Sequence, residues 1–108
     1  MIDLIEDNRQ AIEDLCREYG VQRLAVFGSA AKGIFDPATS DLDFVVDLGG
    51  YEPGTAGRYL GLIVALEKLF GREVDVVTLH ARTSSAFRRE VERTSQTIYE
   101  RDVKTVAA

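Results

Sequence analysis

The sequence predicts an α/β (α+β) fold in which helices pack on a small sheet, and three observations support this. Apolar side chains recur with helical spacing over residues 2–19 and again over 59–70. Three runs of strand length, residues 22–27, 42–48 and 73–79, are mainly apolar. The long connection between the second and third runs has the size of a crossover between parallel strands.

The first half of the chain alternates helix, strand and short helix. Acidic residues near the start of the 2–19 helix suit its dipole, Gly20 provides a left-handed stop, and the apolar stripe is interrupted only at Asn8. The 22–27 strand is apolar on both faces, as expected in a covered sheet. Residues 29–32 favour one or two helical turns, and 34–40 have the composition of a loop.

The second half of the chain again alternates strands with helices, and one of its strands carries acidic residues on one side. Residues 49–57 form a glycine-rich connection, and Gly71 closes the 59–70 helix. Ser84 is the expected cap of a last helix over 84–93, and residues 97–99 form a short extended piece. The predicted order is therefore α-β-α-β-α-β-α. Within the 42–48 strand, alternation separates two faces: Asp41, Asp43, Val45 and Asp47 on one, and Leu42, Phe44, Val46 and Leu48 on the other.

The bulk properties indicate a single globular domain over residues 1–108. Apolar residues make up 45% of the 108 residues, which is enough for a core but leaves no run that could cross a bilayer. The net charge of -5 disfavours direct nucleic-acid binding, which depends on clustered Lys and Arg. The lone Cys16 cannot form an internal disulfide and is expected to pack as a small apolar residue. We expect a cytoplasmic protein with no membrane association.

The stretch from Gly28 to Asp43, GSAAKGIFDPATSDLD, concentrates the residues that could carry chemistry. A strand that ends at Gly28 and turns into a short helix aims free backbone N–H groups at one point, which suits a phosphate, and Ser29 adds a hydroxyl donor. Gly33 permits an unusual backbone conformation after that helix. On this glycine and serine pair alone, an ordinary strand-to-helix turn is the stronger interpretation.

Three aspartates change that balance. Asp41 and Asp43 are in an i, i+2 relation, so their side chains leave the same strand face with roots roughly 6 to 7 Å apart. Two such carboxylates can converge on a hard divalent cation, which would also relieve their repulsion. Asp75 interrupts an apolar strand, where aspartate is disfavoured, and could complete a metal triad or accept a proton. The alternative is that these carboxylates meet solvent.

The combined motif resembles the DNA polymerase β-type nucleotidyltransferase superfamily. The residues that make up this motif are Gly28, Ser29 and Gly33, then Ser40-Asp41-Leu42-Asp43, and a later Asp75 within EVDVVTL. Size and element order resemble, more narrowly, the minimal nucleotidyltransferase (MNT) proteins that act as antitoxins beside HEPN-domain toxins. This resemblance implies a three-stranded mixed sheet with helices packed on it, ATP as substrate, one or two Mg²⁺ ions, and transfer of AMP to a tyrosine hydroxyl of a HEPN toxin.

The resemblance also assigns roles to individual residues. Asp41, Asp43 and Asp75 match the catalytic metal ligands, whereas phosphate or nucleotide binding falls to five positions: Gly28, Ser29, Lys32, Gly33 and Ser40. Many family members carry arginines where this chain has Ala30 and Lys32, and a lysine cannot offer the fork of a guanidinium. A minimal domain exposes its catalytic face, so we expect a partner protein or a second copy to cover it.

Two other functions compete with the antitoxin enzyme. The chain could neutralise its partner by complex formation without catalysis, or it could transfer a nucleotide to a small molecule. The intact set of three aspartates favours an enzyme over a binding module. The absence of a second domain that would shape a small-molecule pocket weakens the other alternative.

Overall fold

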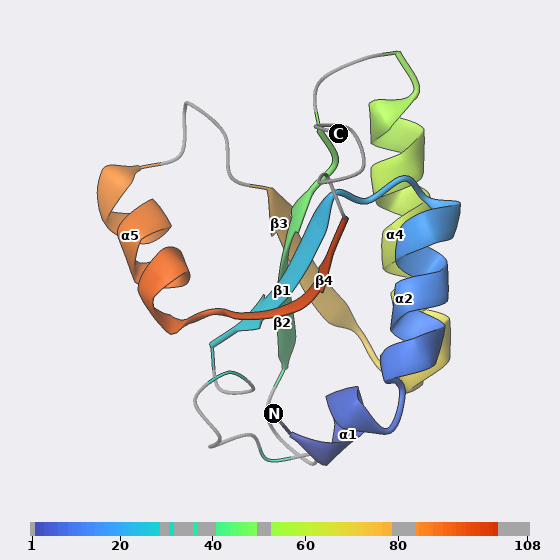
Figure 1. The fold of residues 1–108 in the computed structure, drawn as a ribbon, viewed down its shortest axis with the longest axis horizontal. Coiled ribbons are helices and arrows are strands. Elements are labelled where there is room, and N and C mark those ends of the chain that lie inside the picture. The colour runs from blue at the N-terminus through green and yellow to red at the C-terminus, as the bar shows by residue number, and fades with distance from the viewer. Residues whose placement is uncertain are drawn as a thin grey trace, which may run out of the picture.

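A computed structural model of the chain describes residues 2–28, 31, 36, 41–49, 53–78 and 84–101. Its centre is a four-stranded mixed sheet in the order β3-β2-β1-β4 (Figure 1). β1 is antiparallel to both β2 and β4, whereas β2 and β3 are parallel. The strands are β1 Arg23–Phe27, β2 Leu42–Asp47, β3 Val74–Thr78 and β4 Gln96–Glu100. The predicted α+β class and the parallel β2–β3 pair are confirmed.

The expected count of three strands is wrong, because the segment predicted as a short extended piece is the full edge strand β4. It pairs with β1 from Val26↔Gln96 to Arg23↔Glu100, with a bulge near Leu24 and Ala25. The five residues QTIYE are too short and too irregular to show a clear period-2 pattern. Their strand conformation depends on the free edge of β1, a partner about 70 residues earlier in the chain.

Helices account for the rest of the described elements: α1 Asp3–Glu6, α2 Arg9–Glu18, α4 Thr55–Phe70 and α5 Ser85–Thr94. The predicted 2–19 helix is divided into α1 and α2 at Asp7 and Asn8, where the apolar stripe is interrupted. The Asn8 side-chain amide donates to the Leu4 carbonyl at 2.8 Å, and this stabilises the break. α4 begins at Thr55, earlier than the predicted Tyr59, and Gly71 caps it in the left-handed conformation as expected.

One face of the sheet is covered by α2 and α4, which lie side by side to the right of the strands in Figure 1. Leu42, Phe44 and Val46 of β2 are all buried on this face, so the predicted alternation is confirmed. Phe44 stacks on Phe70 of α4 with ring centroids 6.1 Å apart. Cys16 of α2 is fully buried as well, and this burial raises the pKa of its thiol to about 12.

The opposite face of the sheet carries only α5 among the described helices (Figure 1). Ser84 caps this helix as predicted, because its Oγ accepts a hydrogen bond from the Phe87 backbone N–H at 3.1 Å. α5 packs through the buried Val91 and through an edge-to-face contact of Phe87 with Phe27 of β1 at 6.2 Å. None of the helices in the described part of the chain has the length and apolar character needed to span a membrane.

Candidate functional site

The sheet register places two of the candidate catalytic residues, Asp43 and Asp75, side by side on neighbouring strands. Phe27 of β1 pairs with Asp43 of β2, and Asp43 pairs with Asp75 of β3. Direct partners in neighbouring strands project to the same face of a sheet. The row formed by Phe27, Asp43 and Asp75 therefore lies on the face opposite the α2 and α4 layer. The predicted juxtaposition of Asp43 with Asp75 is present, at the ends of β2 and β3 where these strands begin.

Asp43 is the electrostatic centre of this row. The pKa of its carboxyl is raised to about 6, first by partial burial and then by the negative charge of Asp75, a side-chain hydrogen bond with Asp75 and the charge of Asp41. A hydrogen bond between two carboxyl groups needs a proton on one of them, so this contact favours the protonated form of Asp43. Asp75 is exposed on edge strand β3 and therefore accessible to an incoming group.

Asp41 stands at the margin of the pair. It is exposed, it precedes the first residue of β2, and its charge is the smallest of the four influences on the Asp43 pKa. Within the described ranges, no three or more His, Cys, Asp or Glu side chains are gathered closely enough to hold a metal ion. The structure thus brings Asp43 and Asp75 together, and it brings Asp41 within electrostatic reach only.

The donor set still fits a hard divalent cation. Mg²⁺ commonly takes one or two carboxylates from the protein and completes its octahedron with water and substrate phosphate. Asp43 and Asp75 supply that number of carboxylates on one sheet face, and partial burial together with the neighbouring negative charges raises the pKa of Asp43. A cation bound between Asp43 and Asp75 would offset the repulsion between their negative charges.

Gly28 has a role in the structure that its sequence context only partly indicated. Its φ is +68°, in the left-handed region, and a Cβ built on it would lie 2.6 Å from Oδ2 of Asp43. The bare Cα of Gly28 therefore gives the Asp43 carboxylate room against the end of β1. From the sequence, we predict that Gly28 lets a phosphate approach the backbone closely. In the structure, the Asp43 carboxylate also lies close to this glycine.

Four of the predicted phosphate-binding residues, namely Ser29, Lys32, Gly33 and Ser40, lie outside the described residues. Between them, Ala31 is helical and buried, whereas the rest of the helical turn predicted over 29–32 lies outside the described residues. The carbonyl of Ala31 accepts a hydrogen bond from Nε2 of Gln96 at 2.8 Å. Sequence reasoning missed this contact, since no local pattern links two residues that are 65 positions apart.

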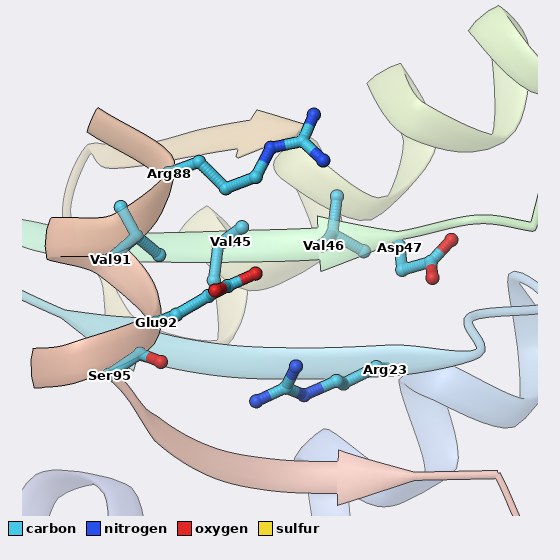
Figure 2. Close-up of a pocket in the computed structure, with 8 residues that line it drawn as sticks. All are labelled: Arg23, Val45, Val46, Asp47, Arg88, Val91, Glu92 and Ser95. Carbon is cyan, nitrogen blue, oxygen red and sulfur yellow. The ribbon is translucent and has the colours of Figure 1, made fainter. Parts of the chain in front are cut away.

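A cavity of about 230 Å³ lies on the same sheet face as the aspartates, between α5 and the strands (Figure 2). Val45 and Val91 contribute apolar surface to it, and Arg88 extends from α5 over the sheet. The cavity lies toward Asp47, at the far end of β2 from Asp43. A second cavity of about 560 Å³ surrounds the start of α4. Neither of these two cavities is lined by Asp43 or Asp75.

Comparison with known families and proteins agrees with the geometry. A family model described as nucleotidyltransferase domain matches residues 8–104. A candidate protein adenylyltransferase of Methanocaldococcus jannaschii, MJ1379, is 32% identical over 76 residues, which cover 70% of this chain and 72% of that protein.

Two solved structures are also similar. The structure of a candidate minimal nucleotidyltransferase has 35% identity and a TM-score of 0.70, and the match covers 88% of this chain and 95% of that one. A complex of the tri-AMPylated Shewanella oneidensis HEPN toxin with its MNT antitoxin contains a chain with 20% identity and a TM-score of 0.62. That match covers 94% of this chain and 83% of the other, and it bears on the fold alone.

Proposed function

The chain belongs to the nucleotidyltransferase domain family, and from this premise we propose that it transfers AMP from ATP to a tyrosine hydroxyl of a HEPN-type toxin, thereby acting as an antitoxin. The observation that carries the proposal is the pairing of Asp43 with Asp75 beside the left-handed Gly28 on one open sheet face. The adenylyltransferase name of the similar archaeal protein, and the AMPylated toxin bound to a similarly folded antitoxin, support the choice of AMP and of acceptor.

In the proposed reaction, the acceptor oxygen forms a bond to the α-phosphorus of ATP while the bond from that phosphorus to the bridging oxygen breaks. Pyrophosphate leaves with the electron pair, and the acceptor hydroxyl gives up its proton. In-line displacement places the attacking and leaving oxygens on opposite sides of the phosphorus. The protein therefore needs a group that grips the β- and γ-phosphates and another that accepts the proton.

Each residue has a part in this scheme. Ser29 and the backbone after Gly28 would hold the β- and γ-phosphates, with Lys32, Gly33 and Ser40 as additional contributors to nucleotide binding. Asp75, exposed on the edge strand, would orient the acceptor hydroxyl and take its proton.

Asp43 and Asp75, with Asp41 beside them, would hold Mg²⁺, which supplies charge stabilisation at the α-phosphoryl group when bound. Partial burial is the first cause of the raised Asp43 pKa, and the neighbouring charges of Asp75 and Asp41 add to it.

The open face also has a consequence for assembly. Asp75 is exposed, so this carboxylate is accessible to water in the described part of the protein. We expect the toxin, or a second copy of this chain, to cover the face when the acceptor enters. A cytoplasmic location follows from this role, because ATP and the toxin would both be available there.

The test is incubation of the protein with Mg²⁺, ATP labelled at the α-phosphate and a purified HEPN-type toxin, with mass spectrometry of the toxin. The proposal expects label on a toxin tyrosine, and its loss by about a thousandfold in the Asp41→Asn, Asp43→Asn double variant. Asp47→Asn is the matched control, because Asp47 lies on the same strand and is exposed at its other end. Undiminished transfer by the double variant would disprove the proposal.

A stable complex without any AMP adduct would instead support neutralisation by binding alone. Label on a small-molecule acceptor and none on the toxin would support the remaining alternative. Substitution of the modified tyrosine in the toxin provides the complementary control, since transfer should then stop although the complex still forms.

A further inference from the structure

The last strand of the sheet reaches the proposed phosphate-binding turn through one side chain. Gln96 is the first residue of β4 and pairs with Val26 near the end of β1. Its Nε2 donates to the Ala31 carbonyl at 2.8 Å, in a part-buried hydrogen bond. Ala31 follows Gly28 by three positions and is itself buried. The contact therefore joins the C-terminal edge of the sheet to the backbone that follows β1.

This hydrogen bond holds a rigid unit of the backbone at Ala31. The Ala31 carbonyl belongs to the same planar peptide group as the backbone N–H of Lys32, so fixing the oxygen also fixes the orientation of that plane. Very short helices are marginal in isolation because nucleation costs more than a single turn of hydrogen bonds returns. A phosphate grip made of backbone N–H groups consequently needs an anchor from elsewhere in the fold, and Gln96 supplies one.

We propose that Gln96 is a positioning residue for ATP: by holding the Ala31 carbonyl, it orients the backbone three residues after Gly28, within the stretch that we propose to bind the β- and γ-phosphates. The inference rests on the proposed function and adds to it a residue outside the motif. The amide is chemically specific for this task, because it donates to a carbonyl, whereas a carboxylate of the same shape can only accept and would also repel phosphate.

The kinetic test compares wild type with Gln96→Ala and Gln96→Glu in the AMP transfer reaction with toxin. Loss of one hydrogen bond of this kind is expected to raise the KM for ATP roughly three- to tenfold, with at least as large a rise for Gln96→Glu. The KM for the toxin and kcat should change less than about twofold, because Gln96 acts through Ala31 and lies on β4, which β1 and β2 separate from β3 and Asp75. Gln10→Ala is the matched control, since Gln10 makes an exposed side-chain bond to Asp14 on α2.

A second measurement does not need activity. Hydrogen exchange of the ligand-free protein, read on peptides that cover residues 28–35, should be faster in Gln96→Ala than in wild type and in Gln10→Ala. Equal exchange and an equal KM for ATP would overturn the inference. Faster exchange spread over the whole chain together with an unchanged KM would also overturn it, since that result means global destabilisation.

The two proposals fail in different ways. If wild type transfers no AMP, the proposed function fails, yet the local exchange comparison and the dissociation constant for ATP still decide the role of Gln96. If wild type transfers AMP and the Gln96 variants match it in both readouts, only the role of Gln96 fails.

Discussion

The two faces of the sheet are made from the same strands yet follow opposite rules. On the face toward α2 and α4, Leu42, Phe44 and Val46 are buried within the apolar core cluster. On the other face, Asp43 pairs with Asp75, and the described cover is the single helix α5. The apolar face toward α2 and α4 supplies the stability, so the other face can carry carboxylates whose burial in a core would be costly.

The two faces also differ in how tightly their helices are held. Residues of both α2 and α4 enter the continuous core cluster, whereas α5 is held by Val91 and by the contact of Phe87 with Phe27. Phe87 remains 40% exposed although it is the largest apolar residue of α5. Among the described helices, α5 alone contributes no residue to the core cluster, so the carboxylate face has a weakly attached helix beside it.

The largest expected effect is a loss of stability when a side chain is truncated on the apolar face toward α2 and α4. Phe44→Ala removes a fully buried ring that stacks on Phe70, and it should lower the free energy of unfolding by about 3 to 5 kcal/mol. Val45→Ala, the adjacent residue on the half-buried carboxylate face, should cost only about 1 kcal/mol. Urea unfolding of both variants measures the contrast. Equal losses would show that the two faces share one core.

A substitution at the edge of the carboxylate face should have an intermediate effect. Gly28→Ala forces a side chain into the left-handed region and places its Cβ against the Asp43 carboxylate. We expect the free energy of unfolding to fall by about 2 kcal/mol. AMP transfer should fall by a larger factor than this loss of stability alone would cause. Gly54→Ala is the matched control, because Gly54 also has positive φ but a Cβ added there would meet nothing within 4 Å. If the two variants lose stability and transfer equally, backbone strain alone explains the glycine.

The smallest expected effect is a gain in stability on substitution of Asp43, and the size of this gain depends on pH. The pKa of Asp43, about 6 in the folded protein, is above its unfolded value of about 4, so ionisation opposes folding. This cost of ionising Asp43 in the folded protein is absent below about pH 4, grows as the pH rises from about 4 to about 6, and is complete above about pH 6. Asp43→Asn should therefore stabilise the metal-free protein by on the order of 1 kcal/mol at about pH 7.5, after allowance for solvent screening, and by nothing near pH 4.

Chemical unfolding in EDTA across this pH range measures that difference. Addition of millimolar Mg²⁺ should then stabilise wild type at about pH 7.5 and leave Asp43→Asn almost unchanged, because a cation that binds the folded state adds to its stability. A constant difference between the two proteins from about pH 4 to about pH 8 would show that the carboxyl is not perturbed. Equal stabilisation of both by Mg²⁺ would place the cation elsewhere.

Local pattern made much of this molecule predictable. The i, i+2 alternation in β2 separates Leu42 and Phe44 from Asp43 without reference to any other strand, and the Ser84 cap and the Gly71 stop are set by their own neighbours. The resemblance carried by the glycine, serine and aspartate motif led to the family that the whole-chain comparison shows. Such features are readable because their physical causes act within a few residues.

The tertiary structure decided what depends on partners distant in sequence. It made the 96–100 segment a fourth strand, set the register that places Asp43 beside Asp75, left Asp41 at the margin, and joined Gln96 to Ala31. It also gave Gly28 a neighbour in Asp43. Strand register and edge pairing are fixed by contacts between segments that the chain brings together only on folding, and no single segment encodes them.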